Sequence, residues 1–159
     1  MFGFSWEGLI LSVLFLLLFP GAVIDWKHLI LPDEITLFGL VLGLVLALFS
    51  PHISILNALL GAITGGGLLL ILTFFYPGGM GGGDVKLMAM VGSFLGWQLA
   101  LGTIFLGAVL GILYYVLQAA KGQASRKMKL PFGSFLAAGA FLAYFCGQEI
   151  WDWYLGLFI

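Results

Sequence analysis

The sequence predicts an all-α membrane protein, built as a polytopic bundle of about six transmembrane helices. Of the 159 residues, 62% are hydrophobic and only 8% are charged, whereas soluble domains carry about 25% charged residues. The apolar residues form long runs, and a bilayer core of about 30 Å needs about 20 of them per helix. We therefore expect a single transmembrane domain that comprises residues 1–159.

Polar or glycine-rich segments divide the chain into six expected spans. The first is expected to be a retained span, because the N-terminus lacks the basic region and small-residue cleavage site of a signal peptide. The weakest boundary is the one at Gln98, between the fourth and fifth spans. The spans are expected at residues 4–24, 35–49, 53–76, 84–97, 99–119 and 131–148, with an aromatic tail suited to the membrane interface at residues 151–154.

The charged residues predict the orientation of these spans. All six basic residues fall in the three connections that six crossings place on one side of the membrane, at residues 25–34, 77–86 and 119–130. The opposite side carries acidic residues and neither Lys nor Arg. Because cytoplasmic loops carry an excess of Lys and Arg, we expect the three connections to be cytoplasmic and both termini to lie outside.

Glycines at a spacing of four residues predict that the helices pack closely. Small residues at this spacing let helix backbones approach one another in lipid. The alternative is that the pairs merely reflect the 24 glycines of the chain. The pairs are Gly39 and Gly43, Gly61 and Gly65, Gly92 and Gly96, and Gly107 and Gly111.

Several classes of function find no support in the sequence. The single cysteine, Cys146, excludes an internal disulfide and a cysteine-cluster metal site. His28 and His52 are expected on opposite sides of the membrane and therefore cannot share a metal ion. No basic run is typical of nucleic-acid binding. We expect no metal, no cofactor and no nucleic-acid partner; the partners that remain are membrane lipid and a substrate.

Two acidic residues are the candidates for a catalytic role. Asp25 ends the first expected span and Asp84 begins the fourth, so their carboxylates meet if those spans are neighbours. Like charges at short distance share a proton and titrate as a unit. The ionised member can then activate water while the protonated member donates to a carbonyl, which hydrolyses a peptide without a covalent intermediate.

Structural roles and other functions are open alternatives at this point. Asp84 follows three glycines and is well placed to cap a helix, and Asp33 could cap the second span in the same way. Asp25 could be a solvated charge at the end of a span. Among functions, a small transporter or channel with interfacial carboxylates is the main alternative, because glycine-broken helices and carboxylates also mark ion pathways. A purely structural membrane subunit is another.

Three motifs favour the hydrolytic interpretation. The segment Gly79-Met80-Gly81-Gly82-Gly83-Asp84-Val85-Lys86-Leu87 resembles the Gly-x-Gly-Asp signature of type IV prepilin peptidases, which are aspartic proteases of the bacterial inner membrane. Ile24-Asp25 followed by Leu31-Pro32-Asp33 is similar to the family's first-aspartate motif, and Pro131-Phe132-Gly133 to its last-helix motif. The motifs occur in the family's order and span nearly the whole chain.

The resemblance implies a specific activity and specific residues. It implies that Asp25 and Asp84 are the two catalytic aspartates. It further implies cleavage of the basic leader of prepilins or pseudopilins, ahead of their apolar N-terminal helix and after a glycine, at the cytoplasmic edge of the membrane. Such cleavage serves type IV pili or type II secretion and needs no metal. The other motif residues are implied to be supporting: Asp33, Gly81, Gly83 and Lys86.

The chain departs from longer members of the family at its N-terminus. Those members carry a cytoplasmic domain with paired Cys-x-x-Cys motifs and methylate the new N-terminus with S-adenosylmethionine. This chain begins almost directly at its first span and has one cysteine. We therefore expect a short form without that domain, and the resemblance extends to cleavage but not to methylation. An archaeal preflagellin-type protease is a close alternative, but Pro131-Phe132-Gly133 and the context of Asp25 favour the bacterial family.

Overall fold

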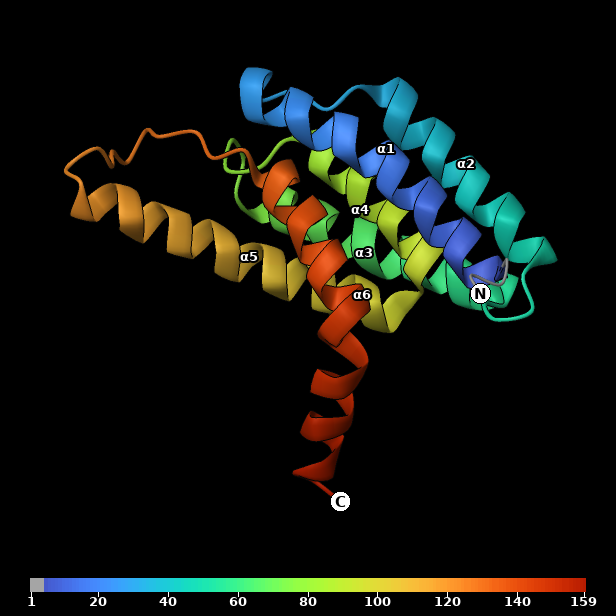
Figure 1. The fold of residues 1–159 in the computed structure, drawn as a ribbon. Coiled ribbons are helices and arrows are strands. Elements are labelled where there is room, and N and C mark those ends of the chain that lie inside the picture. The colour runs from blue at the N-terminus through green and yellow to red at the C-terminus, as the bar shows by residue number, and fades with distance from the viewer. Residues whose placement is uncertain (1–4) are drawn as a thin grey trace.

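The computed structural model describes residues 5–159, and within this range the secondary structure is entirely helical (Figure 1). This confirms the predicted all-α class. Six helices follow one another along the chain, in agreement with the number of expected spans. They are α1 (Trp6–His28), α2 (Asp33–Phe49), α3 (Ile55–Phe75), α4 (Gly82–Leu95), α5 (Trp97–Ala120) and α6 (Phe132–Gly156).

The helices differ in how well they suit a bilayer. Three of them, α1, α3 and α5, are long and apolar enough to cross a membrane by length and composition. In contrast, α2 has 17 residues and α4 has 14, which is fewer than the roughly 20 that a full crossing requires. Of the six expected spans, three are therefore supported by helix length and composition, and the other helices are shorter or more polar.

Helix α4 is the centre of the bundle, which explains why it can be short. It contacts all five other helices, and its side chains Met88, Met90, Val91 and Phe94 are essentially inaccessible to solvent. A helix enclosed by protein on every side has little contact with lipid, so it does not need a long apolar surface. Asp84, in its first turn, is also buried, although Gly82 at the start of the helix is exposed.

Glycines bring α3 against α4 at backbone distance and let α4 side chains reach the backbone of α2. A side chain at Gly61 of α3 would overlap the carbonyl oxygen of Gly92 in α4, and a side chain at Gly92 would overlap that of Gly61. Gly39 and Gly43 of α2 instead lie against α4 side chains, that of Met90 at Gly39 and those of Ser93 and Phe94 at Gly43. The predicted glycine interfaces are thus confirmed in α2, α3 and α4.

Three predicted boundaries move in the structure. Helix α1 continues through the polar residues 25–28 and ends where Leu29 adopts a left-handed conformation with φ of 56°, so Asp25 lies inside a helix. The break between α4 and α5 is at Gly96, with φ of 83°, and not at Gln98. Helix α6 continues through the aromatic tail, and its C-terminal part extends beyond the other helices (Figure 1).

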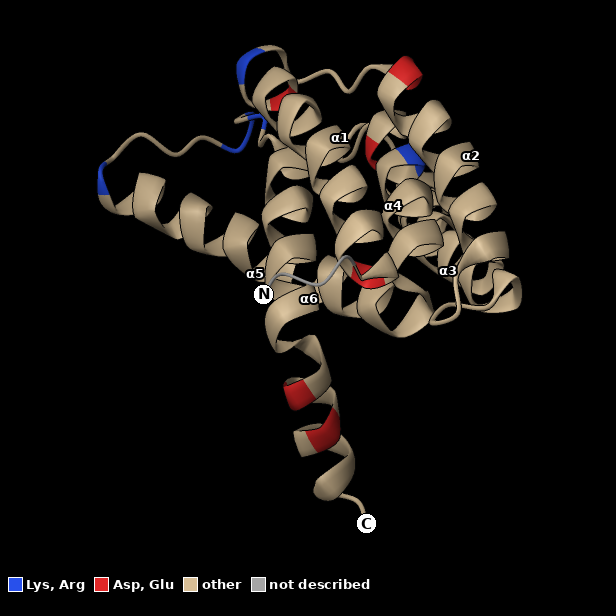
Figure 2. Ribbon diagram, turned by 45° about the vertical axis from the view of Figure 1, so that its right-hand side comes forward, with Lys and Arg blue, Asp and Glu red and all other residues tan. Residues whose placement is uncertain are grey.

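The charges are distributed unevenly along the bundle. Lys and Arg lie toward one end of it, here called the basic end, formed by the last turn of α1, the start of α4 and the connection between α5 and α6 (Figure 2). Acidic residues are found both at this end and far from it (Figure 2). The grouping of the basic residues agrees with the arrangement of connections that the sequence predicted.

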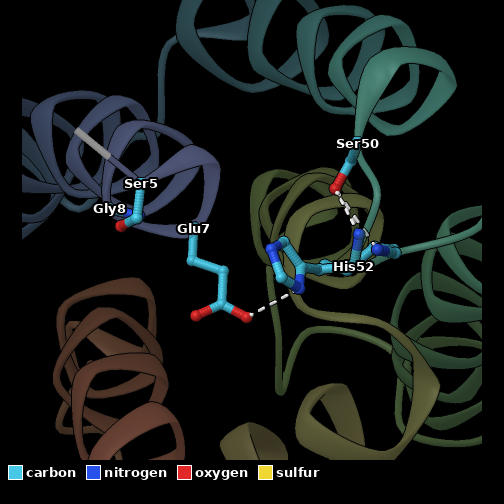
Figure 3. Close-up of polar contacts among 6 residues, drawn as sticks. Ser5, Glu7, Gly8, Ser50 and His52 are labelled. Atoms are coloured by element: carbon cyan, nitrogen blue, oxygen red, sulfur yellow. Dashed lines mark hydrogen bonds and ion pairs between the residues drawn. The ribbon is translucent and has the colours of Figure 1, made fainter. Parts of the chain in front are cut away.

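The opposite end of the bundle is joined by an ion pair. The Nδ1 atom of His52, in the connection between α2 and α3, lies 3.2 Å from Oε1 of Glu7 in the first turn of α1 (Figure 3). The Ser50 hydroxyl accepts hydrogen bonds from the backbone N–H groups of His52 and Ile53. These contacts hold the connection against the start of α1, at the end of the bundle opposite Asp25 and Asp84.

Candidate active site

The structure brings Asp25 and Asp84 together at the basic end of the bundle. Asp25 lies in the last two turns of α1 and Asp84 in the first turn of α4. The two carboxylates are close enough for the charge of one to act on the other. The residues are only 5% and 7% exposed, so neither is a solvated surface charge. The alternative that Asp25 is a solvated charge at the end of a span is therefore wrong.

Neither Asp84 nor Asp33 is the N-cap residue of its helix. The N-cap of α4 is Gly81 and the N-cap of α2 is Pro32, and neither cap makes a side-chain hydrogen bond. Asp33 is already the first residue of α2, so the prediction that it caps this helix is wrong. Asp84 is the third residue of α4, and its carboxylate contacts the backbone of the N-cap residue Gly81 from within the first turn.

Asp25 is held by the first turn of α6. The backbone N–H of Ser134 donates to Oδ2 of Asp25 at 2.9 Å, and the Ser134 hydroxyl lies 3.3 Å from the same oxygen. The hydroxyl also donates to the carbonyl oxygen of Ala22 at 2.7 Å. Both catalytic candidates thus lie at a helix N-terminus, Asp84 at that of α4 and Asp25 at that of α6, where free N–H groups favour anions.

Leu31 joins the three motifs in space. It lies in the connection between α1 and α2 and is buried. A Cβ atom added at Gly83 would lie 3.0 Å from its Cβ, and one added at Gly133 would lie 2.7 Å from its Cδ1 and 3.0 Å from Oδ2 of Asp25. The absence of side chains at Gly83 and Gly133 therefore lets α4, α6 and Leu31 close around the carboxylates.

The supporting residues of the sequence prediction divide into two groups. The Nζ atom of Lys86 lies 2.7 Å from Oδ2 of Asp33, and this pair joins α4 to α2 at the surface, with side chains 40% and 56% exposed. Gly81 is exposed, and a Cβ added there would meet no atom closer than 3.9 Å. Gly83 is thus the sterically required glycine of its motif, whereas Gly81 serves as the helix cap.

An apolar pocket of about 280 Å³ adjoins Asp25 on the side of the bundle. Ser134, which binds the Asp25 carboxylate, is part of its wall, and Trp26 stands beside it in edge contact with the rings of Tyr114 and Phe135. An apolar group in this pocket would therefore contact Ser134, which in turn binds the Asp25 carboxylate. The lining residues are Phe19, Ala22, Val23, Trp26, Lys27 and Ser134.

Sequence reasoning missed Ser134. The residue directly follows Pro131-Phe132-Gly133, and a hydroxyl in the first turn of a helix was the available signal. Its partner, however, lies 109 residues earlier in the chain, so no local pattern could pair the two. Among residues 5–159, no group of three or more His, Cys, Asp or Glu side chains is arranged to hold a metal ion.

Comparison with known proteins identifies the family. Residues 10–116, which include both aspartates, match the Type IV leader peptidase family. The chain belongs to the type IV leader peptidase family. The match confirms the family resemblance that the sequence suggested.

Named relatives of this family resemble the chain along almost its whole length. It is 34% identical over 154 residues to the prepilin leader peptidase/N-methyltransferase of Bacillus subtilis (strain 168), an overlap of 97% of this chain and 62% of the relative. Proteins with the same description from Stutzerimonas stutzeri and Pseudomonas aeruginosa are 35% and 34% identical, each with 97% of this chain and 55% of the relative covered. The chain thus spans less than two thirds of the length of these curated relatives. No solved structure shows a significant match to it.

Proposed function

We propose that the chain is a membrane aspartic endopeptidase that removes the basic leader of type IV prepilins or pseudopilins by cutting after a glycine. The observation that carries the proposal is the meeting of two buried aspartates, Asp25 and Asp84, from separate helices. Membership of the type IV leader peptidase family supports it. So does the description of the relatives as prepilin leader peptidases.

The proposed mechanism uses the two carboxylates as an acid–base pair. The pair holds one proton, because two like charges at short distance do not both ionise easily. The ionised carboxylate takes a proton from a water molecule, whose oxygen attacks the scissile carbonyl carbon, while the protonated carboxyl donates to the carbonyl oxygen. The tetrahedral diol then collapses: one of its hydroxyls returns a proton to the pair as the C=O bond re-forms, the C–N bond breaks, and the amine leaves with the other proton of the pair.

The surroundings of the pair suit a substrate that is half apolar and half basic. The apolar pocket beside Ser134 suits the apolar helix that follows the leader. Asp33 and Glu34, at the start of α2, place further carboxylates near the site, which favours a cationic leader. We propose that this end faces the cytoplasm of a bacterial inner membrane, because Lys and Arg gather at it.

A transporter is less well supported by the arrangement of the charges. A relay for ions or protons needs ionisable groups at several depths of the membrane. Along the described helices, the acidic residues lie toward the two ends of the bundle rather than through its middle (Figure 2). The site therefore fits chemistry at one membrane face better than passage across the membrane.

The proposal is tested by cleavage of a prepilin in lipid vesicles that contain the purified chain. Mass spectrometry of the products locates the cut, and the same vesicles report ion flux. We expect the wild type to cut after the leader glycine. Asp84→Asn should abolish the cut, whereas Asp152→Asn, which alters an acid near the C-terminal end of α6, should preserve it. An inert wild type, or a flux that depends on Asp84 without cleavage, would contradict the proposal.

A further inference from the structure

We propose that Ser134 is a positioning residue for Asp25. Its hydroxyl can form a hydrogen bond with the Asp25 carboxyl group both when that group is protonated and when it is ionised. This inference rests on the proposed function, because it assigns a role within the acid–base pair. Ser134 lies in the first turn of α6, and Asp25 lies near the end of α1. The contact between them joins the first and last helices of the bundle at the site.

The geometry gives Ser134 two independent holds on one oxygen. Its backbone N–H lies 2.9 Å from Oδ2 of Asp25 and also reaches the Pro131 carbonyl oxygen at 3.1 Å. Its hydroxyl lies 3.3 Å from Oδ2 and 2.7 Å from the Ala22 carbonyl oxygen. Since Ala22 precedes Asp25 by less than one helical turn, both hydroxyl contacts anchor Ser134 to the same part of α1.

The single proton of the hydroxyl decides what these contacts can do. A serine hydroxyl donates one hydrogen and accepts through its lone pairs, whereas the Ala22 carbonyl only accepts. While the proton points to Ala22, a lone pair faces Oδ2 and can accept a hydrogen bond from a protonated Asp25. When Asp25 is ionised, the hydroxyl can turn and donate to Oδ2 instead. The same group therefore complements both forms of the carboxyl.

This property matters because Asp25 is almost inaccessible to water. With 5% of the residue exposed, few water molecules besides the reacting one can reach the carboxyl to replace a lost hydrogen-bond partner. A buried polar group that loses its partner is costly. A partner that reverses from donor to acceptor keeps Oδ2 satisfied throughout the cycle and holds the carboxyl in one orientation.

The chain offers a conservative variant and a matched control. Ser134→Ala removes the hydroxyl and keeps the backbone N–H contact. Ser134→Thr restores the hydroxyl and adds one methyl group at a half-buried position. Ser12→Ala is the control, since the Ser12 hydroxyl also donates to a carbonyl of α1, that of Gly8 at 2.6 Å, but lies far along the helix from Asp25.

Two measurements on the full chain in lipid vesicles test the inference. The first is prepilin cleavage, for which we expect Ser134→Ala to lower kcat about five- to tenfold with KM nearly unchanged, as for loss of one hydrogen bond in the reacting state. Ser134→Thr should recover most of the rate, and Ser12→Ala should match the wild type. The second is the infrared C=O stretching band of the Asp25 carboxyl, identified by its loss in Asp25→Asn.

We expect the infrared band to shift in Ser134→Ala and to stay in place in Ser134→Thr and Ser12→Ala. An unshifted band together with wild-type kcat in Ser134→Ala would overturn the inference. So would a loss of rate that Ser134→Thr does not restore and that accompanies a lower unfolding temperature, because that result indicates a purely structural role. If the band shifts but the wild type does not cleave prepilin, the contact between Ser134 and Asp25 is supported and the proposed function is contradicted.

Discussion

Leu31 packs directly against Gly83, so the connection after α1 closes on the first turn of α4 beside Asp84. A Cβ atom added at Gly83 would lie 3.0 Å from the Leu31 Cβ, whereas one added at the neighbouring Gly82 would meet no atom within 4 Å. Both glycines belong to the first turn of α4. They therefore form a matched pair that separates the effect of crowding at the site from the effect of losing a glycine.

Gly83→Val should impair cleavage far more than Gly82→Val. The valine at position 83 must displace Leu31 or the first turn of α4, and a misplacement of about 1 Å at a catalytic group can cost about a hundredfold in rate. We expect at least a tenfold loss for Gly83→Val and a rate within about threefold of wild type for Gly82→Val. Prepilin cleavage at matched protein levels is the measurement. Equal rates in the two variants would show that the close approach of Leu31 has no role in shaping the site.

Gly61→Ala should destabilise the bundle, whereas Gly67→Ala in the same helix should not. The added methyl at Gly61 would overlap the backbone of Gly92, but one at Gly67 meets nothing within 4 Å. We expect a loss of about 1–3 kcal/mol at position 61 from overpacking and a gain of about 0.5–1 kcal/mol at position 67 from reduced backbone freedom. Unfolding in detergent, followed by circular dichroism, measures both. A stable Gly61→Ala variant would contradict the packing of α3 on α4.

The sequence predicted the number and type of helices well, because long apolar runs and glycine spacing are local signals. Boundaries were predicted less well where polar residues occur within a helix. Asp25 and its neighbours read as a loop, yet α1 continues through them to His28, because protein surrounds Asp25 and Ser134 satisfies it. The turn at Gly96 was placed two residues late, at the polar Gln98. Hydropathy shows where a polar residue lies, but it does not show that a glycine adopts a positive φ.

Only the aspartates in the sequence motifs of the site could be predicted from the sequence. Asp25 and Asp84 stood out as rare acids at the ends of apolar runs. The role of Leu31 and the contact of Ser134 were not predictable, because each depends on which helices are neighbours. That information lies in long-range packing, such as the approach of α6 to α1, and not in any local spacing.

Asp33→Asn should leave most of the activity, in contrast to Asp25→Asn and Asp84→Asn. Asp33 pairs with Lys86 at the surface, where the side chains are 56% and 40% exposed, and such pairs contribute about 0–1 kcal/mol. We expect cleavage within about fivefold of wild type for Asp33→Asn and for Lys86→Met, with the double variant no worse than either. Rates measured for the three variants check this. A loss as large as that of Asp84→Asn would move Asp33 into the catalytic group.

Glu7→Gln should have no effect on cleavage, although it breaks the ion pair with His52 (Figure 3). The pair joins the end of the bundle opposite the basic end, and its side chains are half exposed. We expect an unchanged kcat and KM, and a change in unfolding free energy of no more than about 1 kcal/mol. Cleavage and thermal unfolding of this variant check the expectation. A clear loss of kcat would show that the opposite end of the bundle controls the site.

The most direct test of the central claim compares Asp25→Asn, Asp84→Asn and the double variant in prepilin cleavage, each with its helical content and unfolding temperature verified. If the two carboxylates act as one acid–base pair, each single variant should lose at least about a thousandfold in rate, and the double variant should lose no more than either, because residues that act as a unit are not additive. A single variant that cleaves within tenfold of wild type, or a double variant whose loss is the product of the two single losses, would contradict the pair.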